Sequence, residues 1–134
     1  MSKKLEIVVD EYATPIMAYA APDMDIPSMN DLLEKEGFRH LPVLDDGKPI
    51  GMISMRDLLL IKSLNVHFDL KAKDIMTPDP YCVRKGASLE EVAFHMSEAK
   101  IGSALIVDDQ GKADSIFTSV DGLNALVEIT RGEI

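Results

Sequence analysis

The sequence has a single cysteine, no tryptophan and no long apolar run. One cysteine cannot form an internal disulfide, and the apolar neighbours of Cys82 predict a buried, unreactive thiol. The apolar run at residues 58–61 stops at Lys62, far short of a membrane-spanning helix. Near the start, Glu6 and Asp10 interrupt the apolar region that a signal peptide needs. We therefore expect a cytoplasmic protein that makes no use of a membrane.

Positive charge is also scarce. The 14 lysines and arginines are outnumbered by 23 aspartates and glutamates, which gives a net charge of −9. Affinity for a nucleic-acid backbone comes from a surplus of lysine and arginine, so we expect no nucleic-acid partner. A small anionic ligand is not excluded, because it needs only one local pocket with a helix N-terminus and one or two cations.

Catalytic groups in a productive pattern are missing as well. An enzyme needs a nucleophile beside a base, paired carboxylates with separated pKa values, or a metal, and no such set has convincing spacing here. Glu91 and His95 lie one helical turn apart, but two ligands on an exposed helix do not make a metal centre. We expect a protein that is not an enzyme and requires no metal or cofactor.

What the sequence does contain is an internal repeat. A shift of 63 residues aligns Thr14-Pro15 with Thr77-Pro78. One extra residue in the second copy, Gln110, changes the shift to 64, and this shift aligns Asp57 with Asp121. Few residues are identical, but the order of residue classes between them is the same in both copies. The chain is therefore predicted to contain one structural unit twice.

Both copies predict the order strand, helix, strand, strand, helix. Asp25 before an apolar series and Gly37 after it predict a capped helix, and Ser88 with Glu91 predicts a capping box at the matching helix. Two short apolar runs, separated by two aspartates and a glycine, then predict a strand pair. The strand pairs are expected at residues 41–44 with 50–54 and 104–107 with 115–118, and the second helices at 55–65 and 119–128.

The predicted fold class is α/β, more narrowly α+β. We expect the first unit at residues 1–65, including its N-terminal lead-in, and the second at 66–134, with 66–74 as the connection. Together they would form one module.

Three motifs resemble those of a known family. One is the lead-in Ile-Met-Thr-Pro at residues 75–78, echoed by Tyr-Ala-Thr-Pro at 12–15. The second is Gly-Phe-Arg-His-Leu-Pro-Val at 37–43, which runs into Asp-Asp-Gly, and the third is Gly-Met-Ile-Ser-Met-Arg-Asp-Leu at 51–58. In this order, over residues 9–128, the sequence resembles a tandem pair of cystathionine-β-synthase (CBS) domains, also called a Bateman module.

The resemblance implies two β-α-β-β-α units packed sheet to sheet with pseudo-two-fold symmetry and two clefts between them. It implies a regulatory module that binds AMP, ADP or ATP, with S-adenosylmethionine as another ligand. It also implies a homodimer that signals to an effector protein not identified by the sequence. The alternative is a module that serves dimerisation alone and binds no ligand.

Ser54 with Asp57, and Thr118 with Asp121, fit two interpretations. A hydroxyl at the N-cap with an acid three residues later is a capping box, which needs no ligand. An open helix N-terminus also attracts a phosphate, and a nearby carboxylate accepts hydrogen bonds from ribose hydroxyls. By resemblance, both aspartates are expected to contact a nucleotide.

Arg39 and Arg56 are the expected phosphate ligands. Arg56 lies in a first helical turn, where a cation opposes the helix dipole, so a functional reason is more plausible there. The alternative is that both arginines simply face solvent. His40 would add a pH-sensitive donor, or would be a satisfied surface histidine.

The resemblance also pairs residues of the two copies. Asp57 is expected to share a cleft with Tyr81, Cys82, Gly102 and Ser103, and Asp121 with Ala18, Tyr19 and His40. Either tyrosine would give adenine an aromatic contact, or would be a core residue.

The two copies differ in charge. The second has Gly102-Ser103 in place of Arg39-His40 and Val120 in place of Arg56. We therefore expect the Asp57 cleft to bind phosphates better. The Asp121 cleft would be weaker, suited to a less charged ligand, or empty.

Overall fold

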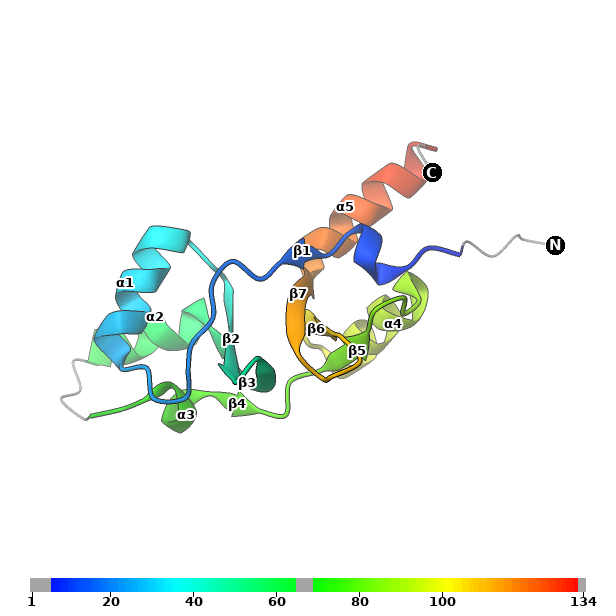
Figure 1. Cartoon of the computed structure of the whole chain (residues 1–134). Coiled ribbons are helices and arrows are strands. Elements are labelled where there is room, and N and C mark those ends of the chain that lie inside the picture. The colour runs from blue at the N-terminus through cyan, green and yellow to red at the C-terminus, as the bar shows by residue number, and fades with distance from the viewer. Residues whose placement is uncertain (1–5, 65–68, 133–134) are drawn as a thin grey trace. The chain divides into compact units, whose positions relative to one another are not determined.

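The computed structural model describes residues 6–64 and 69–132, which form two compact units. The contiguous unit consists of the described residues between 16 and 80. The composite unit joins residues 6–15 to residues 81–132. Each unit has its own sheet, its own helices and its own buried core (Figure 1).

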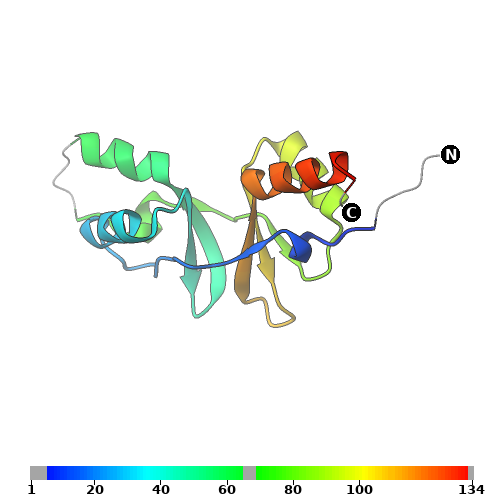
Figure 2. The same ribbon diagram turned by 90° about the horizontal axis from the view of Figure 1, so that it is seen from above.

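The contiguous unit is built on a three-stranded antiparallel sheet in the order β2-β3-β4. Its helices α1 and α2 pack against each other, as Figure 2 shows. A parallel bridge from Ala20 to Val43 extends the sheet beyond β2. The core contains Met29, Leu41, Ile53 and Leu58, each fully buried. In chain order the elements are α1 (Ile26–Glu36), β2 (His40–Asp45), β3 (Lys48–Ser54), α2 (Met55–Leu64), α3 (Ala72–Ile75) and β4 (Thr77–Pro78).

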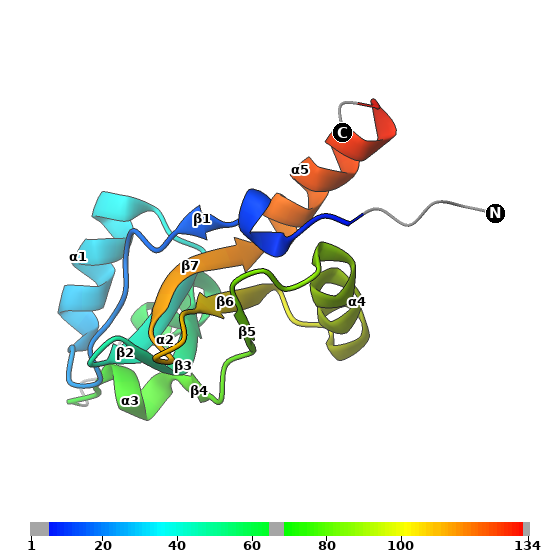
Figure 3. The same cartoon turned by 45° about the vertical axis from the view of Figure 1, so that its right-hand side comes forward.

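The composite unit is built on a four-stranded sheet in the order β1-β7-β6-β5. β5 and β6 are parallel and the other pairs are antiparallel; Figure 3 shows β1 beside β7. Its core includes Val9, Val92, Ile106 and Phe117. The elements are the 3-10 helix η1 (Val9–Glu11), β1 (Thr14–Pro15), β5 (Cys82–Arg84), α4 (Leu89–Ala99), β6 (Ser103–Val107), β7 (Ala113–Thr118) and α5 (Ser119–Thr130).

Local sequence signals account for the helix ends. The Asp25 side chain accepts a hydrogen bond from the Ser28 N–H at 2.8 Å, and α1 ends at Gly37, whose φ of 66° suits glycine. The Ser88 side chain likewise accepts from the Glu91 N–H, at 3.3 Å. The expected end of the second helix at Asn65 lies outside the described residues, and the expected connection contains the short helix α3.

The two copies exchange their lead-in segments. β1 precedes the first copy but pairs with β7 of the second, with Thr14 opposite Ile116 and Pro15 opposite Ser115. β4 precedes the second copy but pairs with β3 of the first. Its Thr77 lies opposite Met52 and its Pro78 opposite Gly51, which is the same register in the repeat. Each compact unit therefore contains residues from both sides of the division expected between residues 65 and 66. The sequence did not predict this, because pairing between strands far apart in the chain leaves no local pattern.

One close approach depends on a glycine. A side-chain Cβ at Gly51 would lie 2.7 Å from Cγ and 2.9 Å from Cβ of Met76, which precedes β4, and would also meet its sulfur. The second copy has Ser115 at the position of Gly51 and Ala13 at that of Met76. In the contiguous unit the large Met76 thus packs against a glycine, whereas in the composite unit the small Ala13 stands at the position of Met76.

None of the helices in residues 6–64 and 69–132 has both the length and the apolar character to cross a bilayer.

Candidate functional site

The contiguous unit brings five of the expected site residues to one end of its sheet. Ser54 ends β3 and lies opposite His40, the first residue of β2. The backbone of the next residue, Met55, donates to the Arg39 carbonyl at 2.9 Å. Arg56 and Asp57 follow in the first turn of α2. Residues from two chain segments therefore meet where α2 begins.

A capping box organises the start of α2. The Asp57 N–H donates to Ser54 Oγ at 3.1 Å, and the Ser54 N–H donates to Asp57 Oδ2 at 3.4 Å. Ser54 and Asp57 therefore form the predicted capping box. A nucleotide can still bind here, because the half-buried Asp57 carboxylate has further acceptor positions and the helix N-terminus attracts anions.

Two arginines and a histidine lie at this end of the sheet. Arg39 and Arg56 are both exposed. His40 is half-buried, and its Nδ1 is buried without a hydrogen-bond partner among the described residues. Burial, and then the neighbouring Arg39 charge, hold the pKa of His40 below its usual value. His40 is therefore not a satisfied surface histidine.

The segment before α1 adds two exposed apolar side chains. Met17 is 77% exposed and Tyr19 is 53% exposed, whereas the intervening Ala18 and the following Ala20 are buried. The Ala20 N–H donates to Pro42 O at 2.9 Å, which places this segment along β2. Sequence reasoning named Tyr19 but missed Met17. The alternation of large and small residues at 17–20 was the available signal.

The composite unit repeats the capping box, but Gly102 and Val120 stand at the positions of Arg39 and Arg56. The Thr118 N–H and its hydroxyl donate to Asp121 Oδ2 at 2.8 and 3.1 Å, and the Asp121 N–H donates to Thr118 Oγ1 at 3.4 Å. Ser103 lies opposite Thr118, and the Ser119 N–H donates to Gly102 O at 3.1 Å. Asp121 is only 7% exposed.

Tyr81 and Cys82 lie side by side at the start of β5 but have different surroundings. The Tyr81 ring packs against the core and stacks on His95, with ring centroids 4.1 Å apart. Burial and the Glu91 charge raise the pKa of Tyr81, and burial raises the pKa of the half-buried Cys82 thiol. These contacts favour the core interpretation for Tyr81, whose place in the repeat corresponds to the buried Ala18.

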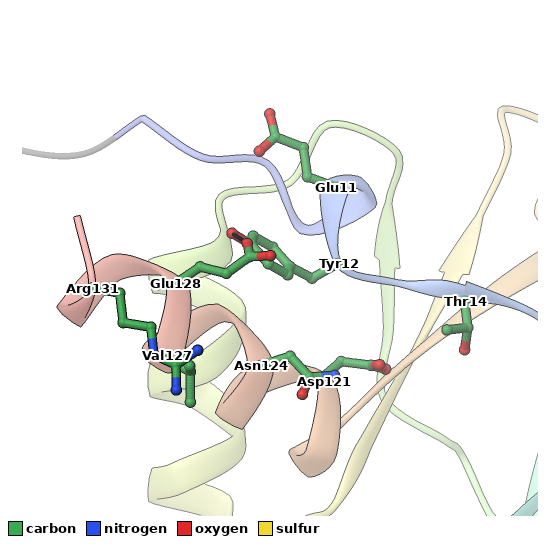
Figure 4. Close-up of a pocket in the computed structure, with 8 residues that line it drawn as sticks. All are labelled: Glu11, Tyr12, Thr14, Asp121, Asn124, Val127, Glu128 and Arg131. Atoms are coloured by element: carbon green, nitrogen blue, oxygen red, sulfur yellow. Dashed lines mark hydrogen bonds between the residues drawn. The ribbon is translucent and has the colours of Figure 1, made fainter. Parts of the chain in front are cut away.

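A cavity of about 700 Å³ opens beside Asp121 in the composite unit. Asn124 and Glu128 project from α5 on one side, and Tyr12 and Thr14 line the other (Figure 4). The Tyr12 hydroxyl donates to Glu128 Oε2. The remaining lining residues are Glu11, Val127 and Arg131.

The lining of this cavity carries three carboxylates and one arginine. Sequence reasoning predicted only Asp121 of this set, because the cavity exists only when the N-terminal segment packs beside α5. Among residues 6–64 and 69–132, no group of histidine, cysteine and acidic side chains is placed to hold a metal.

The predicted site residues thus divide between the units. The contiguous unit holds Tyr19, Arg39, His40, Ser54, Arg56 and Asp57, and the composite unit holds Tyr81, Cys82, Gly102, Ser103, Thr118 and Asp121. That residues of both groups share a cleft stays a prediction.

Known proteins similar to this chain share its fold. One crystal structure, of CBSX2 in complex with AMP, has a TM-score of 0.78 and 28% identity, over 92% of this chain and 98% of that one. Another, of the cytosolic domain of the Mg²⁺ channel MgtE in complex with ATP, has a TM-score of 0.72 and 25% identity, over 84% of this chain and 46% of that one.

The similarity extends to parts of longer proteins. Inosine-5'-monophosphate dehydrogenase of Pasteurella multocida is 30% identical over 104 residues, which cover 75% of this chain and 20% of that protein. The chain spans less than half the length of the curated relatives it matches. The family model of the CBS domain matches twice, at residues 9–63 and 72–128. The chain therefore belongs to the CBS domain family and carries the domain as a tandem pair.

Proposed function

We propose that this chain is a regulatory module that binds an adenine nucleotide, AMP, ADP or ATP, and catalyses no reaction. The proposal is supported mainly by the arrangement of groups at one end of the sheet in the contiguous unit. Two exposed arginines and a helix N-terminus lie there with the capping carboxylate Asp57. A nucleotide needs cationic donors for its phosphates and an acceptor for its ribose, and this site provides both.

In the proposed complex each group has one task. Arg39 and Arg56 bind phosphate oxygens, aided by the backbone N–H groups of α2. Asp57 accepts hydrogen bonds from the ribose hydroxyls with the lone pairs that the Ser54 N–H leaves open. Tyr19 and Met17 offer exposed apolar surface for a base. This assigns Tyr19 to the Asp57 site of its own unit, and not to the Asp121 cleft that the resemblance implies. Ser54 keeps its structural task of holding the Asp57 backbone.

The composite unit is proposed as the weaker site. Its Asp121 occupies the same place in the capping box as Asp57, but Gly102, Ser103 and Val120 replace the basic side chains. The charged lining of the adjoining cavity consists of three carboxylates and one arginine, and this negative balance repels a polyphosphate. A ligand with less negative charge, such as S-adenosylmethionine, suits this site better than ATP.

The similar proteins support a ligand-binding role for this chain, but not the enzymatic or transport activity of any longer protein. The similar CBSX2 and MgtE structures contain AMP and ATP, respectively. The match to the dehydrogenase covers a fifth of that enzyme. A module of this kind works in the cytoplasm, where adenine nucleotides are found, and passes its signal to an effector protein.

The helix faces support association of two copies of the chain. Exposed apolar patches mark sites of protein contact. Large apolar side chains are exposed along α2 at Leu59, Leu60 and Leu64, and along α5 at Val120, Leu123, Leu126 and Val127. We propose a homodimer through these helices. Light scattering should give twice the chain mass, and a monomer at micromolar concentration would contradict this part of the proposal.

Calorimetric titration with AMP, ADP, ATP and S-adenosylmethionine tests the binding proposal. Asp57→Ala removes the ribose acceptor and should weaken nucleotide binding about 10- to 100-fold, the range for a hydrogen bond to a charged group. Asp25→Ala is the matched control, because it removes the N-cap of α1 in the same unit. It should cost similar stability and leave affinity unchanged.

Three results would count against the proposal. Two equal sites, or loss of binding in Asp121→Ala but not in Asp57→Ala, would contradict the ranking of the sites. No binding, together with no rise in melting temperature for any of the four ligands, would favour the purely structural module.

A further inference from the structure

His40 stands out among the residues of the contiguous site because its polar atoms are incompletely satisfied. Its Nδ1 is buried and has no hydrogen-bond partner among residues 6–64 and 69–132. Buried polar atoms of this kind are uncommon and cost stability, so each needs an explanation. His40 begins β2, lies opposite Ser54 and directly follows Arg39, which is exposed at the proposed phosphate site.

The polar and charged groups near His40 come from its own segment, from β3 and from the start of α2. Arg39 precedes it on the same segment, and β3 presents the neutral Ser54 across the ladder. α2 then begins with Arg56 and Asp57, and the Asp57 carboxylate already accepts from the Ser54 N–H. Tyr19 lies on the segment that runs along the other edge of β2.

The ligand-free imidazole is therefore neutral at physiological pH. Burial disfavours its positive charge, the Arg39 charge adds repulsion, and both lower the pKa of His40. A doubly protonated ring also needs two acceptors, and Nδ1 has none in the part of the chain that the structure describes.

We propose that His40 takes up a proton when a nucleotide phosphate binds beside Arg39, so that binding strengthens as the pH falls. The inference rests on the proposed function. A bound phosphate places negative charge beside the ring and offsets the repulsion from Arg39. Protonation then adds a third positive charge to a site that already contains Arg39 and Arg56.

The direction of the effect follows from linkage. In the free protein the pKa of His40 lies below its ordinary value of 6.5. In the complex its pKa is higher, so the ring keeps its proton to a higher pH. Between these two pKa values the affinity rises as pH falls, by at most about tenfold per pH unit for one proton. Above the pKa of the complex, His40 contributes no pH dependence.

The second copy provides an internal contrast. Its residue at the position of His40 is Ser103, which does not titrate in this range, and Gly102 stands where Arg39 stands. Any ligand bound by the composite unit alone should therefore show no such proton uptake. The inferred pH response belongs to the first copy.

Titration calorimetry of ATP with the whole chain, in buffers of differing ionisation enthalpy at pH 6.5 to 8, tests the inference. The slope of the observed enthalpy against the buffer enthalpy gives the number of protons taken up. Because the terminal phosphate of ATP titrates in the same range, His40→Gln supplies the reference. We expect the wild type to take up more protons than His40→Gln, and the affinities to converge at the highest pH.

The possible results separate the two proposals. Equal proton uptake in both proteins, with ATP bound by both, overturns the role of His40 and leaves the proposed function intact. No ATP binding by the wild type overturns both. If His40→Gln does not fold, an NMR titration of the His40 ring in the wild type replaces it. A ring pKa that ATP leaves unchanged would then overturn the inference.

Discussion

The contact between Gly51 and Met76 permits a quantitative test of the exchanged lead-ins. Gly51→Ala adds one methyl group at a buried position of β3. That methyl would lie 2.9 Å from Met76 Cβ and 2.7 Å from its Cγ, both closer than real Cβ contacts. The main chain before β4 must shift, because one of the crowded atoms is Met76 Cβ and is fixed by the backbone.

The expected magnitude follows from two opposing effects. Adding a methyl group to a well-packed site costs about 1–3 kcal/mol. Replacing a glycine that has an ordinary backbone conformation gains about 0.4–1 kcal/mol through the unfolded chain. Gly51→Ala should therefore lower the free energy of unfolding by about 1–2 kcal/mol. Urea denaturation followed by circular dichroism measures this change.

A double-mutant cycle identifies the contact that is responsible. Met76→Ala removes the sulfur and Cγ but keeps Cβ, so Gly51→Ala should cost about 1 kcal/mol less in that background. Gly51→Ser with Met76→Ala installs in the first copy the serine and alanine that the second copy has at 115 and 13. The combination should be more stable than Gly51→Ser alone.

The control is Gly122→Ala in α5. A Cβ there meets only Phe117 Cζ, at 3.7 Å, which is an ordinary contact. Because alanine is the better helix former, this change should stabilise the chain by up to about 1 kcal/mol. If Gly51→Ala is as stable as the wild type, or if its cost is the same with and without Met76, the packing argument is refuted.

Two further predictions concern folding and pH. A fragment of residues 16–80 should fold as a monomer because it contains β4, whereas residues 1–65 should not; the same cooperativity in both urea transitions would contradict this. Asp25 caps α1, and its hydrogen bonds with Ser28 lower its pKa below 3.8, so its contribution to stability is present above that pH and is lost as the pH falls through the lower, folded-state value. Asp25→Asn should flatten the acid limb of the stability profile, and an unchanged limb would exclude this role.

The sequence was most informative where the structure depends on neighbouring residues. Asp25 and Gly37 marked the two ends of α1, and Thr118 with Asp121 marked the start of α5, because a cap uses atoms within one helical turn. The fold class and the family followed from the order of these signals in two copies.

The exchange of the lead-ins was beyond such reasoning. Both copies carry the same Thr-Pro dipeptide, and nothing local shows which sheet it joins. The cavity beside Asp121 was missed for the same reason, since Tyr12 reaches Glu128 only through that exchange. Packing between distant segments likewise sets the solvent exposure of Met17. It also leaves Nδ1 of His40 without a hydrogen-bond partner among the described residues.

The reciprocal lead-ins give the presence of both copies in one chain a physical consequence. A molecule with a single copy would leave one edge of its sheet unpaired, and open edges recruit strands from other molecules. Two such molecules would complete each other by swapping their Thr-Pro segments. Covalent linkage of the copies turns that encounter into an intramolecular one, with an effective concentration on the order of millimolar. Each half then finds its missing strand at any protein concentration, and dilution cannot separate them.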